Sequence, residues 1–118
     1  MERVTGIGGF FFAAAAPSAL AAWYSEHLGV DPIPSDYGQQ PWTQQAGATA
    51  FAPMASDDPT LAGRAFGLNF RVDDLDAMVA QLRAAGIEVE VDPTEYPNGW
   101  FAQLSDPEGN AIQLWEPS

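Results

Sequence analysis

The stretch FAQLSDPEGNAIQLWE, from Phe101 to Glu116, decides the fold that this sequence predicts. Runs that alternate apolar and polar residues flank Asp106–Asn110, whose proline, glycine and asparagine favour a turn, so we expect an antiparallel hairpin. Pairing outward from the turn puts two apolar cross-strand pairs on one face, Leu104 with Ile112 and Ala102 with Leu114. That face of the hairpin is expected to be core.

The other face of the hairpin mixes aromatic and amide side chains. Because successive strand residues point to opposite faces, Phe101, Gln103, Gln113 and Trp115 share this face. Aromatic rings with a few polar groups are typical of a wall that lines a ligand site, not of a solvated surface. The pattern therefore indicates a binding face.

Composition limits the function classes. The chain has 118 residues, enough for one domain, and no cysteine, which excludes disulfides and thiolate metal sites. Its net charge of -12 repels nucleic acids and anionic membranes. The same negative charge either attracts cationic small molecules or simply keeps the protein soluble. The first residues lack the basic region of a signal peptide, so we expect a cytoplasmic protein with no membrane or nucleic-acid partner.

Hydrophobic spacing predicts the remaining elements. In the first half we expect a strand at 7–12, a helix from Pro17 to Gly29, and strands at 42–45 and 48–52. In the second half we expect a strand at 66–72, a helix capped by Asp73 and Asp74 that ends at Gly86, a strand at 87–91, and the closing hairpin.

The two halves look like copies of one unit. Leu28-Gly29-Val30 recurs as Ala85-Gly86-Ile87 about half a chain later, each at the end of a predicted helix. We therefore predict an α+β fold in which two βαβββ modules, about 1–56 and about 64–118, form one domain over residues 1–118. The modules pair into a curved, cup-forming mixed sheet with the helices outside.

Four motifs in order carry a resemblance to a known family: Tyr24–Gly29, Asn69–Leu75, Asp106–Asn110 and Gln113–Glu116. Together they resemble the vicinal oxygen chelate superfamily, the group of glyoxalases, bleomycin-resistance proteins and extradiol dioxygenases. The resemblance implies paired βαβββ modules, a cup-shaped site and a homodimer. It leaves the chemistry open, because the superfamily includes metal enzymes and metal-free binding proteins.

The resemblance also implies where a divalent metal would be held, on the first and fourth strands of each module. These positions fall near Gly9, Phe51 and Gly67 and on Gln113. Only Gln113 has a side chain that could contact a metal, whereas such an ion needs about three or four histidine or carboxylate donors. We therefore expect no metal site and no cofactor.

Strand parity and position select ten candidate ligand-binding residues and no catalytic residue. Trp42 and Trp100 are included because they lie near strand ends, where they could close over a ligand. An equally simple interpretation is that the aromatic residues fill the space between modules or form a dimer interface. The candidates are Phe11, Trp42, Phe51, Asn69, Arg71, Trp100, Phe101, Gln103, Gln113 and Trp115.

These residues favour a protein that sequesters a flat aromatic molecule, for which the net charge favours a cation. The alternative is a glyoxalase-like lyase or isomerase with an atypical metal or none, but the predicted face lacks a general base. Arg71 could bind a carboxylate or pair with Asp73. His27, the single histidine, is interpreted as a surface residue at a helix C-terminus and not as a catalyst.

Overall fold

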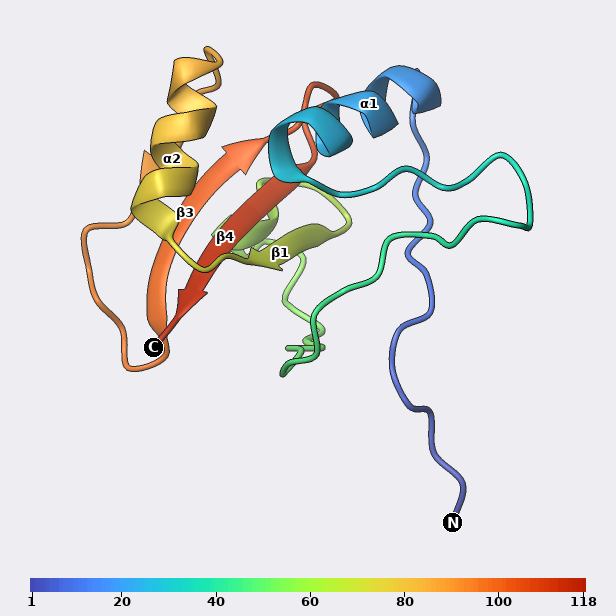
Figure 1. Cartoon of the computed structure of the whole chain (residues 1–118). Coiled ribbons are helices and arrows are strands. Elements are labelled where there is room, and N and C mark those ends of the chain that lie inside the picture. Colours follow the sequence, from blue (N-terminus) through green and yellow to red (C-terminus); the bar gives the residue numbers. More distant parts are fainter.

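The structure, a computed structural model, describes residues 1–118 as two α-helices, one short 3-10 helix and one four-stranded sheet (Figure 1). In chain order the elements are α1 (Pro17–Leu28), η1 (Pro59–Leu61), β1 (Gly67–Arg71), α2 (Leu75–Ala84), β2 (Glu90–Val91), β3 (Gly99–Ser105) and β4 (Ala111–Pro117). The predicted α+β class is confirmed.

The sheet belongs entirely to the second half of the chain. Its strand order is β1-β4-β3-β2, with β1 parallel to β4 and the other neighbours antiparallel, so β1, α2 and the three following strands make one βαβββ unit. The predicted hairpin register is correct, since Leu104 pairs with Ile112 and Ala102 with Leu114. The sheet is open and not closed into a barrel.

Both helices pack on one face of this sheet (Figure 1). In α2 the carboxylate of Asp74 accepts the Ala77 N–H at 3.0 Å, and the Glu116 carboxylate accepts the Leu75 N–H at 2.8 Å, so two acids satisfy the helix N-terminus. The buried core under the helices consists of Leu20, Tyr24, Leu75, Val79, Leu82, Val89, Ala102, Leu104, Ile112 and Leu114.

The hairpin turn holds α1 in place. Pro17 occupies the first turn, and the carboxylate of Glu108 accepts the N–H groups of Ala15 and Ala16 at 2.7 and 3.0 Å. The buried carboxylate of Asp106 accepts the hydroxyl of Tyr24, on α1, at 2.7 Å. These turn residues therefore also anchor the start and the body of a helix that lies more than 80 residues earlier in the sequence.

The first half does not form the predicted strands, which is a correction to the sequence analysis. Residues 7–12, 42–45 and 48–52 have no regular secondary structure, and the N-terminal segment stretches away from the body (Figure 1). A strand needs a neighbouring edge to satisfy its N–H and C=O groups, and no edge within the chain pairs with these segments. Accordingly the radius of gyration, 15.2 Å, exceeds the value of about 13.5 Å for a compact domain of this length.

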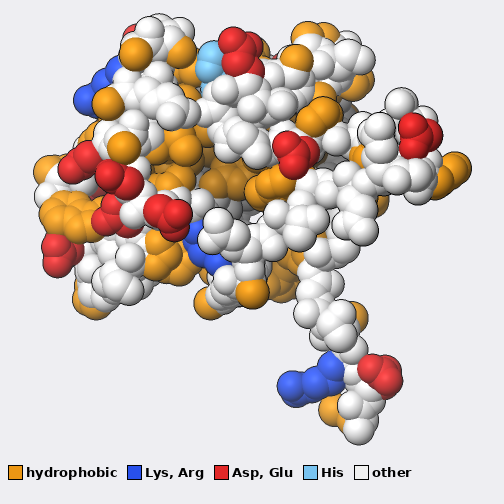
Figure 2. Space-filling model, viewed as in Figure 1, with side chains coloured by type: hydrophobic (Ala, Val, Ile, Leu, Met, Phe, Trp, Pro, Cys, Tyr) orange, Lys and Arg blue, Asp and Glu red, His pale blue; other side chains and the backbone are white.

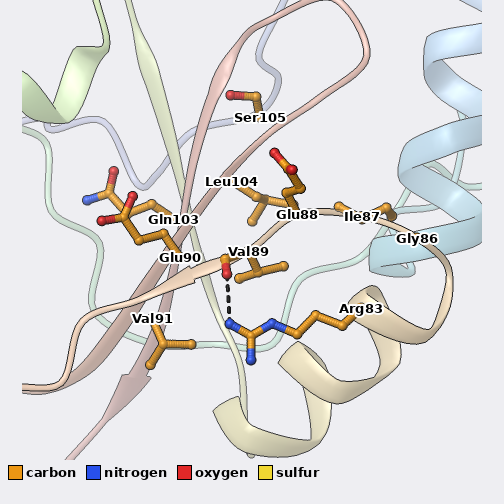
Figure 3. A pocket seen from close by; sticks show the side chains of 10 residues that line it. All are labelled: Arg83, Gly86, Ile87, Glu88, Val89, Glu90, Val91, Gln103, Leu104 and Ser105. Atoms are coloured by element: carbon orange, nitrogen blue, oxygen red, sulfur yellow. Dashed lines mark hydrogen bonds between the residues drawn. The ribbon is translucent and has the colours of Figure 1, made fainter.

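The strand predicted at 87–91 is also shorter than expected. Only Glu90 and Val91 pair with β3, because the chain before them leaves the sheet. The guanidinium of Arg83 donates to the carbonyl oxygen of Val89 at 2.8 Å and so satisfies a group outside the ladder (Figure 3). Val89 itself remains buried against the core.

Candidate functional site

The sheet face that points away from the helices carries six of the ten predicted ligand residues, and we call it the open face. The strand register places Asn69 beside Gln113 and Arg71 beside Trp115, while β3 and β4 align their residues in the same way. The parity argument from the sequence therefore placed these side chains correctly. The open face consists of Asn69, Arg71, Phe101, Gln103, Gln113 and Trp115.

The aromatic part of the open face is a fixed platform. The rings of Phe101 and Trp115 are parallel within 5°, with centroids 6.3 Å apart. The Trp115 indole N–H donates to the carbonyl oxygen of Asn98 at 2.7 Å, and the Tyr96 ring stands edge-on to Phe101 with centroids 5.8 Å apart. A hydrogen bond and a neighbouring ring thus orient the platform before any ligand arrives.

The amides next to this platform keep part of their hydrogen-bonding capacity. Asn69 donates from Nδ2 to Oε1 of Gln113 at 2.8 Å, so one amide orients the other. Gln103 lies directly across from Gln113 and is exposed. An amide has two donors and an acceptor that takes two bonds, so this row can still donate to and accept from a ligand.

Arg71, at the β1 end of the open face, contacts the loop that follows Trp42. Its guanidinium donates to the carbonyl oxygens of Gln45 and Ala46 at 3.0 and 3.4 Å. Arg71 does not form the alternative ion pair with Asp73. Arg71 therefore fixes a loop at one border of the open face.

A depression of about 350 Å³ lies on the open face. Its floor includes Phe101, Gln103 and Gln113, all predicted from the sequence. The structure adds four lining residues that the sequence analysis missed, because they lie outside every predicted strand and helix. The added residues are Thr60, Asp92, Tyr96 and Asn98.

Asp92 is an acid at the rim of this depression. Its carboxylate accepts the Thr94 N–H at 3.0 Å and the Tyr96 hydroxyl at 2.8 Å. The bond from the Thr94 N–H lowers the pKa of Asp92 most, and the bond from the Tyr96 hydroxyl lowers it further. The same bond to Asp92 raises the pKa of Tyr96. Asp92 is therefore charged at neutral pH and is a weak proton acceptor.

The other four predicted ligand residues are not strand residues of the open face. Phe11 and Phe51 are 89% and 85% exposed. The ring centroids of Trp42 and Phe70 are 6.4 Å apart. Phe70 points to the face of the sheet opposite to Arg71, so Trp42 packs on the helix side. Trp100 pairs with Glu116, whose carboxylate bonds to α2, so Trp100 faces the helix side. Their role in binding stays a prediction.

A larger hollow, about 1000 Å³, lies along the β2 edge of the sheet (Figure 3). It is lined by residues 86–91, Arg83 and the end of β3, and Gln103 is its one residue from the predicted set. In Figure 3 the side chains of Glu90 and Gln103 lie together, as their strand pairing requires. Glu90 therefore belongs to the same side of the sheet as the open face.

The residues present do not fit the divalent metal that the superfamily resemblance implies. No three histidine, cysteine, aspartate or glutamate side chains converge as a metal-binding group. Among the implied positions, Gln113 accepts a hydrogen bond from Asn69, and Gly67 has no side chain to donate. Hard and borderline divalent ions need carboxylate or imidazole donors, and these positions supply none.

The sequence of most of the chain matches a known family. A profile of the glyoxalase-like domain family matches residues 9–115. The chain belongs to this family. The family match thereby confirms the resemblance to the vicinal oxygen chelate superfamily, the group to which the glyoxalases belong.

Two solved structures share the fold along almost the whole chain. TnmS3, an antibiotic binding protein from Streptomyces sp. CB03234, is 25% identical and has a TM-score of 0.68, with 100% of both chains covered. Lactoylglutathione lyase from Agrobacterium tumefaciens is 21% identical with a TM-score of 0.60, covering 98% of this chain and 96% of its own. At this identity the lyase shows the fold alone.

One curated relative is closer in sequence over a shorter stretch. CFP32 of Mycobacterium tuberculosis, whose name describes a candidate glyoxylase, is 44% identical over 50 residues, which is 42% of this chain. The match spans 19% of the length of CFP32.

No helix of the glyoxalase-like protein combines the length and apolar character that crossing a membrane requires.

Proposed function

We propose that this glyoxalase-like protein binds and sequesters a flat aromatic molecule on the open face without a metal. The parallel Phe101 and Trp115 rings carry the proposal, because they offer a stacking surface. The amides of Gln103 and Gln113 next to them can satisfy polar groups at the edge of such a molecule. The fold shared with TnmS3, an antibiotic binding protein, supports a binding function rather than catalysis.

The net charge adds a preference for cationic ligands. With a charge of -12 the protein attracts cations from solution and repels anions. A lyase or isomerase reaction, the alternative, would need a base that removes a substrate proton. Asp92 is the one carboxylate that lines the depression, and its lowered pKa weakens it as a base. The lining therefore supports binding better than proton transfer.

Fluorescence anisotropy of N-methylacridinium, a flat fluorescent cation, tests this proposal on protein treated with a chelator. The wild-type protein should raise the anisotropy of the probe. Trp115→Ala should weaken binding by about tenfold, because stacking a flat nucleic-acid base on an aromatic side chain contributes about 1–3 kcal/mol and the probe is a similar flat ring system. Trp100→Ala is the matched control, since Trp100 lies on the helix side of the sheet. Equal losses in the two variants would remove the open face from the proposal.

We further propose that the protein works as a cytoplasmic homodimer. Large apolar side chains of the first half remain exposed, and the outer edge of β1 has no strand beside it. A second copy would cover the apolar side chains and the strand edge together, because extended segments of one copy can form backbone hydrogen bonds with the unpaired edge of the other. Light scattering should give twice the monomer mass; a monomer mass at working concentration would refute the dimer. The exposed residues that a dimer would cover include Phe10, Phe11, Ile33 and Phe51.

A further inference from the structure

The charges on the open face are distributed unevenly. Glu90 pairs with Gln103, and the N–H of the next acid along the chain, Asp92, donates to the carbonyl oxygen of Phe101 at 3.0 Å. Both acids therefore border the open face on its β2 side, whereas its one cation, Arg71, lies at the β1 side. Figure 2 shows acidic side chains gathered on the side of the molecule that carries α2 and the loop between β2 and β3.

No cation of the protein neutralises these acids. The chain has four basic residues and all are arginines. Three of them use their guanidinium groups on backbone carbonyl oxygens: Arg64 on Glu108, Arg71 on Gln45 and Ala46, and Arg83 on Val89. The one close contact between a basic and an acidic side chain is that of His27 with Glu26, whose Nε2 and carboxylate oxygen lie 3.8 Å apart. A positive charge beside Asp92 must therefore come from outside the chain.

Two aromatic residues, Tyr96 and Phe101, line the depression together with Asp92. The Tyr96 hydroxyl fixes one carboxylate oxygen of Asp92, and the Tyr96 ring meets Phe101 edge-on at an interplanar angle of 72°. A cation in this corner would contact a carboxylate and the face of a ring together, and each contact attracts it. Each carboxylate oxygen of Asp92 also keeps a free lone pair for a second donor.

We propose that the corner formed by Asp92, Tyr96 and Phe101 binds the positively charged nitrogen of an organic cation. The ligand then lies with its charge at the β2 side and its flat part over Phe101 and Trp115. This inference rests on the proposed function and deepens it, because it makes the positive charge a requirement for tight binding and assigns it a place. A neutral ring of the same size would stack on the platform but bring no positive charge to the Asp92 carboxylate.

The test compares two probes of nearly equal size and shape, the cation N-methylacridinium and neutral acridine, in mildly alkaline buffer of low ionic strength. Fluorescence titration gives the affinity of each probe for the wild-type protein and for two variants. Asp92→Asn removes the carboxylate of the corner. Glu95→Gln removes one negative charge from the same loop but at an exposed residue that does not line the depression.

The wild-type protein should bind N-methylacridinium about tenfold more tightly than acridine, a preference that added salt should reduce. Asp92→Asn should abolish most of this preference and leave acridine binding unchanged, while Glu95→Gln should keep the preference. Equal affinity of the wild-type protein for the two probes, or equal effects of the two variants, would overturn the inference and leave the proposed function intact. If neither probe bound, both would fail.

Discussion

Removal of one hydroxyl group should measure how strongly the hairpin turn holds α1. Tyr24→Phe deletes the donor of the 2.7 Å hydrogen bond to the buried carboxylate of Asp106 and keeps the ring in the core. Asp106 retains hydrogen bonds from the Asn110 side chain and from the N–H groups of Glu108 and Asn110. We therefore expect the loss of one charged hydrogen bond, about 1.5–3 kcal/mol of the free energy of unfolding.

Urea unfolding followed by far-ultraviolet circular dichroism measures this loss. The midpoint should fall by about 1 M with the m-value unchanged, because the surface exposed on unfolding stays the same. Tyr37→Phe is the matched control, since Tyr37 is fully exposed. A change of less than about 0.5 kcal/mol in Tyr24→Phe, the range of ordinary surface substitutions, would refute the view that this bond anchors α1.

The same bond has a pH dependence with a definite sign. Burial alone would raise the pKa of Asp106, but the hydrogen bonds from Tyr24, Asn110 and Glu108 outweigh it and lower this pKa. A carboxyl whose pKa is lower in the folded state stabilises the protein above its unfolded pKa of about 3.9, and this contribution is lost as pH falls through the folded value. The wild-type protein should therefore lose its advantage over Tyr24→Phe in acid.

Three further changes test other parts of the account. In urea titrations Glu108→Gln should lower the free energy of unfolding by about 0.3–1 kcal/mol, because a negative charge at the α1 N-terminus is lost, whereas the exposed Glu26→Gln should not lower it. Gly99→Ala should prevent native folding, since Gly99 has a φ of 129° and a methyl group there would overlap the carbonyl of Glu116. A circular dichroism spectrum like that of the wild-type protein would contradict this. His27→Gln should leave probe affinity within about a factor of two, and a collapse of binding would make His27 part of the site.

The sequence was sufficient for the sheet of the second half because local patterns determine it. Turn residues fixed the hairpin, and period-two alternation then assigned Phe101, Gln103, Gln113 and Trp115 to one face, as the register confirms. The same alternation also predicts the position of one missed lining residue, Asp92. Continued past the predicted end of the strand at Val91, it puts Asp92 beside Phe101.

Other features could not be predicted from local patterns. Asp106 and Glu108 are turn residues by composition, yet their contacts with α1 join residues more than 80 positions apart. The strands expected at 7–12, 42–45 and 48–52 failed for a related reason. Apolar spacing predicts which residues suit a strand but not whether the chain brings them beside a strand with which they pair.

Thermal unfolding of chelator-treated protein tests the central claim, metal-independent binding of a flat aromatic cation, most directly. One series receives N-methylacridinium and the other receives manganese, iron, nickel or zinc ions. At about a hundred times the dissociation constant the dye should add about 2.7 kcal/mol and raise the midpoint without any metal. Stabilisation by a metal ion with none by the dye would contradict the account and point to glyoxalase-like metal chemistry.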